Sequence, residues 1–278
     1  MKNIEKSNVG VACVGAGYFA QYHIESWNRI DEVDLLAGYD HDLQKVKLLG
    51  LTAYTELTGM LSELPIDILD IITPPTSHLE LIRHALNAEI PLVVCQKPFC
   101  NSLDEAKLAI EESLRAGTQL VVHDNFRFQP WFRTIKQSLD REELGHVQQA
   151  TFRMRPGDGQ GPEAYLDRQP YFQTMNRFLV HETAIHYVDT FRYLFGEPTS
   201  VYADLRKLNP VIAGEDAGII LFDFPDQLSV LYDGNRHLDF EAENKRLTFG
   251  EALIEGTEAS LLLAGDGRVV KRAFDCTD

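Results

Sequence analysis

The sequence predicts an α/β protein in two parts: a doubly wound parallel sheet, followed by an α+β domain with an open, mostly antiparallel sheet. In the first part, apolar runs alternate with segments of helical periodicity, the order in which parallel strands and crossover helices follow one another. In the second part, polar and apolar residues alternate, and turn signals separate the segments. We place the two domains at residues 1–124 and 125–278.

The first strand is expected over residues 9–15, because VGVACVG is apolar throughout and fits a central strand buried on both faces. A helix is expected over 17–30. The stripe that packs this helix onto the sheet consists of Phe19, Ala20, His23, Ile24 and Trp27. The other elements alternate in the same way: strands over 33–40, 67–73, 91–97 and 119–123, and helices over 42–49, 76–88 and 102–116.

The second domain is expected to contain strands that alternate between a buried and an exposed face. They are expected over 147–155, 201–207, 217–224, 228–234, 259–265 and 268–274. One helix, over 181–195, ends at Gly196 with Pro198 just beyond it. The stretch 156–176 is rich in Gly, Pro, Gln and Asp, which predicts a long loop of the kind that often carries function.

Asp and Glu outnumber Lys and Arg by 42 to 26, which gives a net charge of −16. This acidic balance disfavours non-specific binding to nucleic acid or to an anionic membrane. No apolar run approaches the roughly 20 residues that a membrane-spanning helix needs. The N-terminus lacks the apolar core of a secretory signal, so a cytoplasmic location is expected.

The four cysteines, Cys13, Cys95, Cys100 and Cys276, include no pair with CxxC spacing. Cys13 and Cys95 lie inside apolar, strand-like runs. These positions favour buried reduced thiols over a redox or metal-binding role.

A glycine-rich loop connects the first expected strand to the first helix. Residues 15–20, GAGYFA, match G-x-G-x-x-A, the Rossmann fingerprint with alanine in the third place. Gly15 permits the tight turn, and Gly17 lets the backbone approach a pyrophosphate at the helix N-terminus. We therefore predict a dinucleotide site here, with Tyr18 and Phe19 beside the cofactor; the alternative is a purely structural turn.

Asp40 ends the second expected strand, where a carboxylate can accept hydrogen bonds from the adenosine ribose hydroxyls. The same carboxylate would repel a 2′-phosphate, and the next residues, His41 and Asp42, include no arginine to hold one. The sequence therefore favours NAD over NADP. A second interpretation, which does not exclude the first, is that Asp40 caps the following helix.

Further segments follow in a recognisable order: TPPTSH at 73–78, QKP at 96–98, NFRFQP at 125–130 leading into LGHV at 144–147, ETAIH at 182–186 and GTE at 256–258. With the glycine loop, they resemble the Gfo/Idh/MocA family, which comprises glucose–fructose oxidoreductase, inositol dehydrogenase and rhizopine catabolism proteins. The resemblance spans most of the chain. Family members usually continue well past the position of Gly256, so a C-terminal segment is expected to be missing, naturally or by truncation.

The resemblance implies NAD(P)-dependent oxidation or reduction of a sugar, a polyol or a related alcohol. It also implies a C-terminal sheet that is often used for oligomerisation, so a homodimer or homotetramer is expected. Lys97 corresponds to the family lysine beside the nicotinamide and the reacting oxygen. Glu182 and His186 correspond to the acidic residue and the histidine at the substrate.

The chemistry of hydride transfer fits these residues. Oxidation of an alcohol requires removal of the hydroxyl proton, and His186 is our candidate base because histidine titrates near neutral pH. Glu182 lies four residues earlier, on the same face of the expected helix, where it is able to polarise His186 or bond the substrate. Lys97 is suited to stabilising alkoxide charge. The structural alternatives are a solvated lysine, a satisfied helix histidine and a carboxylate favoured by the helix N-terminus.

Other residues complete the predicted site. Thr73, Pro74, His78 and Gln96 are expected to line the cofactor, although His78 fits the cap of its helix equally well. The residues expected on the substrate side are Arg127, Arg153, Arg155, Arg177 and His181. Arg153 and Arg155 share one face of their strand and, with Arg177, would meet an anionic substrate such as a sugar acid; the alternative is a salt-bridged sheet face. His181 and His186 are five residues apart, so no zinc site is expected.

The chain departs from the family pattern at three places. Gln96 replaces the usual glutamate, Glu182 replaces aspartate, and Arg177-Phe178 stands where the family often has a glycine pair. A neutral amide at position 96 can still reach a ribose hydroxyl, but it cannot act as an acid. These departures keep two other functions open: a catalytically silent NAD-binding sensor, and a glycoside-cleaving enzyme that oxidises its substrate only transiently.

Overall fold

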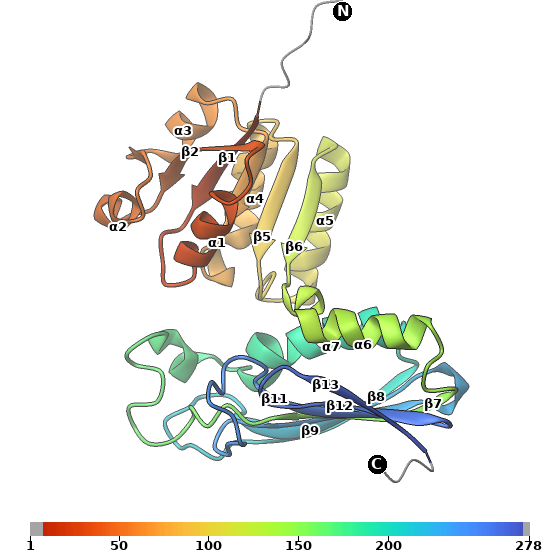
Figure 1. The fold of residues 1–278 in the computed structure, drawn as a ribbon. Helices are drawn as coiled ribbons and strands as arrows, with labels where there is room; N and C mark the ends of the chain where they lie inside the picture. Colours follow the sequence, from red (N-terminus) through yellow and green to blue (C-terminus); the bar gives the residue numbers. More distant parts are fainter. Residues whose placement is uncertain (1–7, 275–278) are drawn as a thin grey trace, which may run out of the picture. The chain divides into compact units, whose positions relative to one another are not determined.

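The computed structural model describes residues 8–274, and its contacts divide the chain into two compact units between His123 and Asp124. Each unit is built around its own sheet (Figure 1). Cys276 lies outside the described residues. Across residues 8–274, no helix combines the length and apolar character that crossing a bilayer requires.

The N-terminal unit contains a six-stranded sheet in the order β3-β2-β1-β4-β5-β6, with every neighbouring pair parallel. Its strands are β1 (Val9–Val14), β2 (Val33–Tyr39), β3 (Ala53–Tyr54), β4 (Ile68–Ile71), β5 (Leu92–Gln96) and β6 (Gln119–His123). Its helices are α1 (Ala20–Trp27), α2 (Leu43–Leu48), α3 (Leu57–Glu63), α4 (His78–Asn87) and α5 (Leu103–Ala116). The strand order reverses between β1 and β4, and ligands of such sheets bind at the carboxyl ends of the strands beside this point.

The C-terminal unit contains a seven-stranded sheet in the order β13-β12-β11-β7-β10-β9-β8. Its strands are β7 (Val147–Met154), β8 (Ser200–Arg206), β9 (Ala217–Asp223), β10 (Ser229–Asn235), β11 (Gly250–Gly256), β12 (Ala259–Leu263) and β13 (Val269–Ala273). Only β7 and β10 pair in parallel, and the other pairs are antiparallel. The predicted fold class, with one parallel and one mostly antiparallel sheet, is confirmed.

Two helices cover one face of the C-terminal sheet. Figure 1 shows α6 (Pro130–Asp140) and α7 (Ile185–Phe195) side by side along it, and the helices also contact each other. Their apolar stripes meet the inward residues of the strands in one core, whose largest members include Phe132, Phe152, Phe191 and Tyr232. Burial of these aromatic side chains provides much of the hydrophobic stabilisation of this unit.

The opposite face of this sheet is open and carries an apolar row. Strand register aligns one residue from each strand across the whole sheet: Tyr202, Leu221, Leu231, Thr151, Leu253, Leu262 and Val270. Tyr202 is 67% exposed and Leu262 45% exposed. We call this set the apolar row.

The structure differs from the sequence prediction at several elements. The first helix is shorter than expected, since it begins at Ala20, and Phe19 is exposed rather than part of the buried stripe. We did not predict β3, α3, α6 and β11. β3 has only two residues and α3 contains a central glycine, Gly59. β11 does alternate between buried and exposed residues, but glycines at both ends obscure the pattern.

The segment between β7 and α7 contains no strand and no α-helix within 156–176, as the sequence predicts. A 3-10 helix, Pro170–Thr174, is the regular element there. The segment has its own small core of Ala164, Tyr165, Phe172, Phe178 and Ile212. It is therefore an ordered loop held by aromatic packing.

Cys13, Cys95 and Cys100 are buried free thiols, as the sequence predicts. Burial raises the pKa of Cys13 and Cys95 well above the usual range and raises the pKa of Cys100 to about 11. Thiols in this state are poor nucleophiles and poor metal ligands.

Candidate functional site

The glycine loop leaves β1 at a point that accepts only glycine. Gly15 has a φ of +99°, and a Cβ added there would lie 2.9 Å from the backbone carbonyl of Ile72. The Gly15 N–H donates to the Tyr39 carbonyl at 2.8 Å, which ties the loop to the end of β2. Both the conformation and the close backbone contact therefore exclude a side chain here.

Gly17, in contrast, has free space around it. A Cβ added at Gly17 would meet no atom within 4 Å, and the residue is exposed. Helix α1 starts three residues later, without a side-chain cap in the described structure, while Ala20 is fully buried beneath it. The open space at Gly17 and the helix start beside it are the combination that a dinucleotide pyrophosphate requires.

Asp40 supports the glycine loop from the end of β2. Its Oδ2 accepts from the Ala16 N–H at 2.7 Å, and its Oδ1 accepts from the Asp42 N–H at 2.9 Å. Each carboxylate oxygen has a second lone pair with which to accept from a ribose hydroxyl. Asp40 is not the cap of α2; that cap is Asp42, whose side chain accepts from Gln44 N–H at 3.0 Å. These residues fit an NAD cofactor.

Gln96 belongs to a buried polar network at the end of β5. Its Nε2 lies 2.7 Å from His23 Nε2 and 3.2 Å from His123 Nδ1, and its Oε1 accepts from the Lys97 N–H at 2.8 Å. His23 Nδ1 in turn lies 2.8 Å from Asp70 Oδ2. The amide is therefore engaged in bonds that hold the backbone of Lys97, which is half-buried and precedes the cis Lys97-Pro98 bond.

His78 connects two loops near the carboxyl ends of β4 and β5. Its ring is fully buried, with Nδ1 2.8 Å from the Phe99 carbonyl and Nε2 2.7 Å from the Thr73 carbonyl. Burial lowers the pKa of His78, although the two carbonyl contacts oppose this effect. The contacts of His78 hold the Thr73-Pro74 loop against the loop that follows Lys97 and Pro98.

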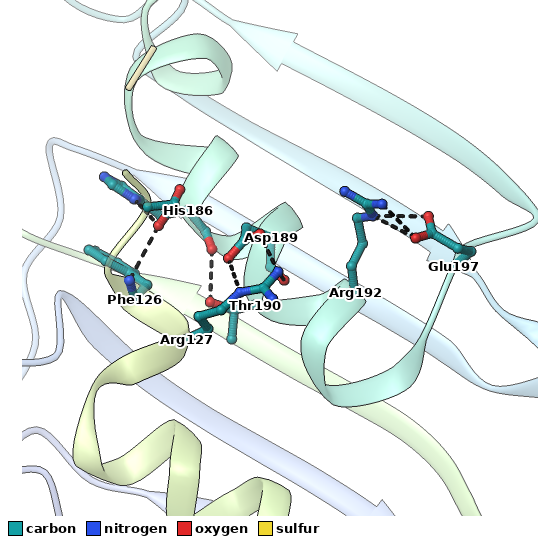
Figure 2. Close-up of polar contacts among 8 residues, drawn as sticks. Phe126, Arg127, His186, Asp189, Thr190, Arg192 and Glu197 are labelled. Carbon is teal, nitrogen blue, oxygen red and sulfur yellow. Dashed lines mark hydrogen bonds and ion pairs between the residues drawn. The ribbon is translucent and has the colours of Figure 1, made fainter. Parts of the chain in front are cut away.

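In the C-terminal unit, His186 is held from two sides. Its Nδ1 lies 2.8 Å from Asp124 Oδ1, and its ring stacks on Phe126 with centroids 4.1 Å apart and planes 5° from parallel. Figure 2 shows His186 and Phe126 beside the ion pair of Arg127 with Asp189. The Nε of Arg127 donates to Asp189 Oδ2 at 2.6 Å, so this arginine, expected on the substrate side, is engaged by a carboxylate.

Glu182 lies in a π-helix, Leu179–Ala184, that precedes α7. The four-residue spacing to His186 therefore does not place the two side chains on one face of a regular α-helix. Glu182 Oε2 accepts from the Thr183 hydroxyl at 2.5 Å and lies 3.5 Å from Arg236 Nη1. Glu182 is buried, like Arg236, so the two form an internal ion pair.

Arg236 is the centre of a charged cluster. It donates to Asp158 with Nε at 3.2 Å and Nη2 at 3.1 Å, and its guanidinium lies over the Tyr165 and Phe178 rings. Burial alone would lower the pKa of Arg236, but Asp158, Tyr165 and Glu182 together hold it above its ordinary value. The cluster links the ordered loop to the π-helix that carries Glu182.

The other arginines expected on the substrate side lie in different environments. Arg153 is exposed and 3.3 Å from Glu251, whereas Arg155 is buried, ion-paired with Asp233, and donates to the Asp233 carbonyl at 2.6 Å. The expectation that both share one strand face is wrong, because β7 ends at Met154. Arg177 is exposed and His181 half-buried.

Sequence reasoning did not identify Asp124, Asp158, Arg236 or the pair of His23 with Asp70. Asp124 stands directly before the NFR motif, which was a usable signal. The other residues are brought to their partners from distant parts of the chain, and no local pattern marks them. Over residues 8–274, no group of three or more His, Cys, Asp or Glu side chains has the arrangement of a metal site.

The glycine loop, the uncapped start of α1 and Asp40 together define an NAD-binding Rossmann protein. The family described as "Oxidoreductase family, NAD-binding Rossmann fold" matches residues 9–123, and the "GFO/IDH/MocA C-terminal domain" matches residues 132–262. The chain belongs to the GFO/IDH/MocA family of NAD-binding oxidoreductases. The recognition made from the motifs is thereby confirmed, as is NAD as the cofactor.

Two similar proteins are D-apiose dehydrogenases. The one from Paraburkholderia graminis is 31% identical over 93% of this chain and 68% of its own length. The one from Rhizobium rhizogenes is 28% identical over 91% of this chain and 72% of its own. A solved oxidoreductase from Agrobacterium radiobacter, in complex with NAD⁺, L-tartaric acid and magnesium, has a TM-score of 0.87 at 26% identity and covers 96% of this chain and 78% of its own.

Proposed function

We propose that the protein transfers a hydride between NAD and a CH–OH group of a sugar or polyol. The observation that carries the proposal is the placement of Lys97 at the carboxyl end of β5, in the same sheet whose β1 ends in the dinucleotide-binding loop. Catalytic groups of open α/β sheets lie at this edge. The similarity to sugar dehydrogenases over most of the chain supports the substrate class.

Each residue has a defined task in this proposal. Bound NAD supplies the hydride acceptor or donor. Lys97 stabilises negative charge on the reacting oxygen, and His186 takes the hydroxyl proton during oxidation or returns it during reduction. Gly15, Gly17 and Asp40 bind the pyrophosphate and ribose, with Tyr18 and Phe19 exposed beside them.

The other cofactor-side residues act mainly through position. Thr73 and Pro74 line the edge of the cofactor site, and His78 holds their loop in place through its two carbonyl contacts. Gln96 holds the backbone of Lys97, which is the role left to an amide where the family usually has glutamate.

We propose a neutral sugar or polyol as substrate rather than a sugar acid. Arg127, Arg153 and Arg155 each pair with a carboxylate of the same chain, so their charges are already compensated. An anionic substrate would have to compete with these internal partners. Arg177 and His181 remain as candidate contacts to the substrate.

We also propose that the protein forms a homodimer or homotetramer through the open face of the C-terminal sheet. The apolar row supports this, since its outer members Tyr202, Leu221, Leu253, Leu262 and Val270 are exposed, and such an apolar sheet face suits a two-fold interface. A cytoplasmic location is part of the same proposal and is supported by the buried, reduced cysteines.

A panel of sugars, polyols and sugar acids with NAD, followed by nicotinamide absorbance, tests the function. We expect turnover of a neutral member and a loss of several orders of magnitude in kcat for Lys97→Met, with NAD affinity unchanged. Lys107→Met, at an exposed position of α5, is the matched control. NAD binding with no turnover across the panel would favour a sensor, and turnover without net NADH would favour transient oxidation.

A further inference from the structure

Asp124 and His186 form a close pair within the C-terminal unit. Their side chains are 11% and 10% exposed, and the Oδ1–Nδ1 distance is 2.8 Å. The same Oδ1 accepts from the Phe126 N–H at 3.2 Å, which fixes the carboxylate relative to its own backbone. A pair this well shielded from water is screened little by salt, so its interaction is stronger than that of an exposed ion pair.

Phe126 fixes the plane of the imidazole. The two rings are nearly parallel and 4.1 Å apart, and Phe126 is itself buried among Tyr187 and Phe249. Rotation of the imidazole out of its plane would break this stack. The stack and the hydrogen bond to Asp124 together determine both the plane of the ring and which nitrogen points toward the carboxylate.

A second interaction, an ion pair, holds the residues that follow Asp124 in register with α7. Arg127, three residues after Asp124, pairs with Asp189, three residues after His186, and also lies 5.5 Å from the Tyr193 ring centroid. Figure 2 shows Arg127 and Asp189 next to His186 and Phe126. Sliding of one segment along the other would therefore disrupt both contacts at once.

The chemistry of the pair determines the tautomer of the neutral ring. An ionised carboxylate only accepts hydrogen bonds, so the Nδ1 of His186 must carry the proton. The lone pair of the neutral imidazole is then on Nε2, the form that a general base requires. Glu182, the carboxylate of the family motif, has its described contacts in another cluster, with Thr183 and Arg236.

We propose that Asp124 is the positioning residue of His186: it holds the ring with Nδ1 protonated, so that Nε2 exchanges the proton with the substrate hydroxyl. This inference rests on the proposed function in assigning the proton transfer to His186. It adds a carboxylate from outside the family motif and assigns Glu182 to anchoring the ordered loop through Arg236.

Nitrogen-15 spectra of the histidine side chains test the tautomer without any substrate. His186→Gln assigns the resonance by its loss. In the wild-type protein near pH 8, we expect a protonated Nδ1 and an unprotonated Nε2 at His186, and a mixture of tautomers in Asp124→Ala. Asp140→Asn, an exposed carboxylate of α6, should leave the spectrum unchanged. A wild-type ring with the proton on Nε2 would overturn the proposal, even if the variant fails to fold.

Kinetics then test the consequence for catalysis on whichever neutral sugar the wild type oxidises. Asp124→Ala should lose about a hundredfold in kcat, the scale of a misdirected general base, with KM and NAD affinity within a few-fold of wild type. A proportionate rise in KM with unchanged kcat would contradict positioning for proton transfer. If the wild type turns over no substrate but the tautomer is as stated, the proposed function fails while the pairing of Asp124 with His186 stands.

Discussion

Three glycines differ in backbone conformation and in the space around them, and these differences predict three separate outcomes of substitution by alanine. Gly15 combines a φ of +99° with a backbone contact at 2.9 Å; Gly50 has a φ of +78° and open space; Gly17 has open space without a positive φ. The series therefore separates backbone strain, steric overlap and ligand contact. Only Gly17 is expected to affect cofactor binding without affecting stability.

The magnitudes follow from these constraints. A non-glycine residue in the left-handed region costs roughly 1–2 kcal/mol, of which the reduced entropy of the unfolded chain offsets about 0.4–1 kcal/mol. Gly50→Ala should therefore destabilise by about 1 kcal/mol. Gly15→Ala adds an overlap with backbone that cannot relax cheaply, for a total of about 2–4 kcal/mol. Gly17→Ala should be neutral or slightly stabilising.

NAD binding should respond differently from stability in Gly17→Ala and Gly50→Ala. A methyl group at Gly17 would occupy the space that the pyrophosphate needs and displace at least one charge-assisted hydrogen bond, worth about 1.5–3 kcal/mol, or about ten- to a hundredfold in Kd. Gly50→Ala should bind NAD normally. Urea unfolding measures stability, and calorimetric titration measures NAD affinity. NAD affinity of Gly17→Ala equal to wild type would refute the placement of the pyrophosphate at this loop.

Three further predictions concern other parts of the chain. Asp40→Asn should reduce the preference for NAD over NADP by at least about tenfold, roughly 1.4 kcal/mol, measured as the ratio of the two dissociation constants; an unchanged ratio would remove Asp40 from ribose recognition. Arg236→Met should cost about 3–5 kcal/mol in urea unfolding because it removes the buried cation that pairs with both Asp158 and Glu182, whereas the exposed control Arg153→Met should cost about 0–1 kcal/mol. Leu253→Lys, in the apolar row, should lower the molar mass in sedimentation analysis without lowering stability, and an unaltered mass would argue against a sheet-face interface.

Patterns that are local in sequence predicted most of the fold and the glycine-rich loop after the first strand. The apolar runs of β1, β4 and β5 and the GAGYFA loop depend on neighbouring residues, so composition and spacing were sufficient. The short β3 and the glycine-bounded β11 lack such a signal, because pairing with neighbouring strands determines them.

The partners of the predicted site residues were less accessible to sequence analysis. Arg236 reaches Asp158 across 78 residues of chain, and His186 meets Asp124 across 62. The π-helix at Leu179–Ala184 also changes the spacing on which the pairing of Glu182 with His186 was argued. Regular α-helical periodicity cannot indicate such a change, so tertiary contacts rather than local pattern decide which carboxylate serves the histidine.

Transfer of a deuterium label from the substrate to the cofactor is the direct test of hydride transfer by this protein. The neutral sugar or polyol that the enzyme oxidises is prepared with deuterium on its carbinol carbon and incubated with NAD and the wild-type protein. We expect deuterium on the nicotinamide of the NADH formed and slower turnover than with the unlabelled substrate. Deuterium that remains in the sugar or is lost to water, with the nicotinamide unlabelled, would contradict hydride transfer as the reaction of this protein.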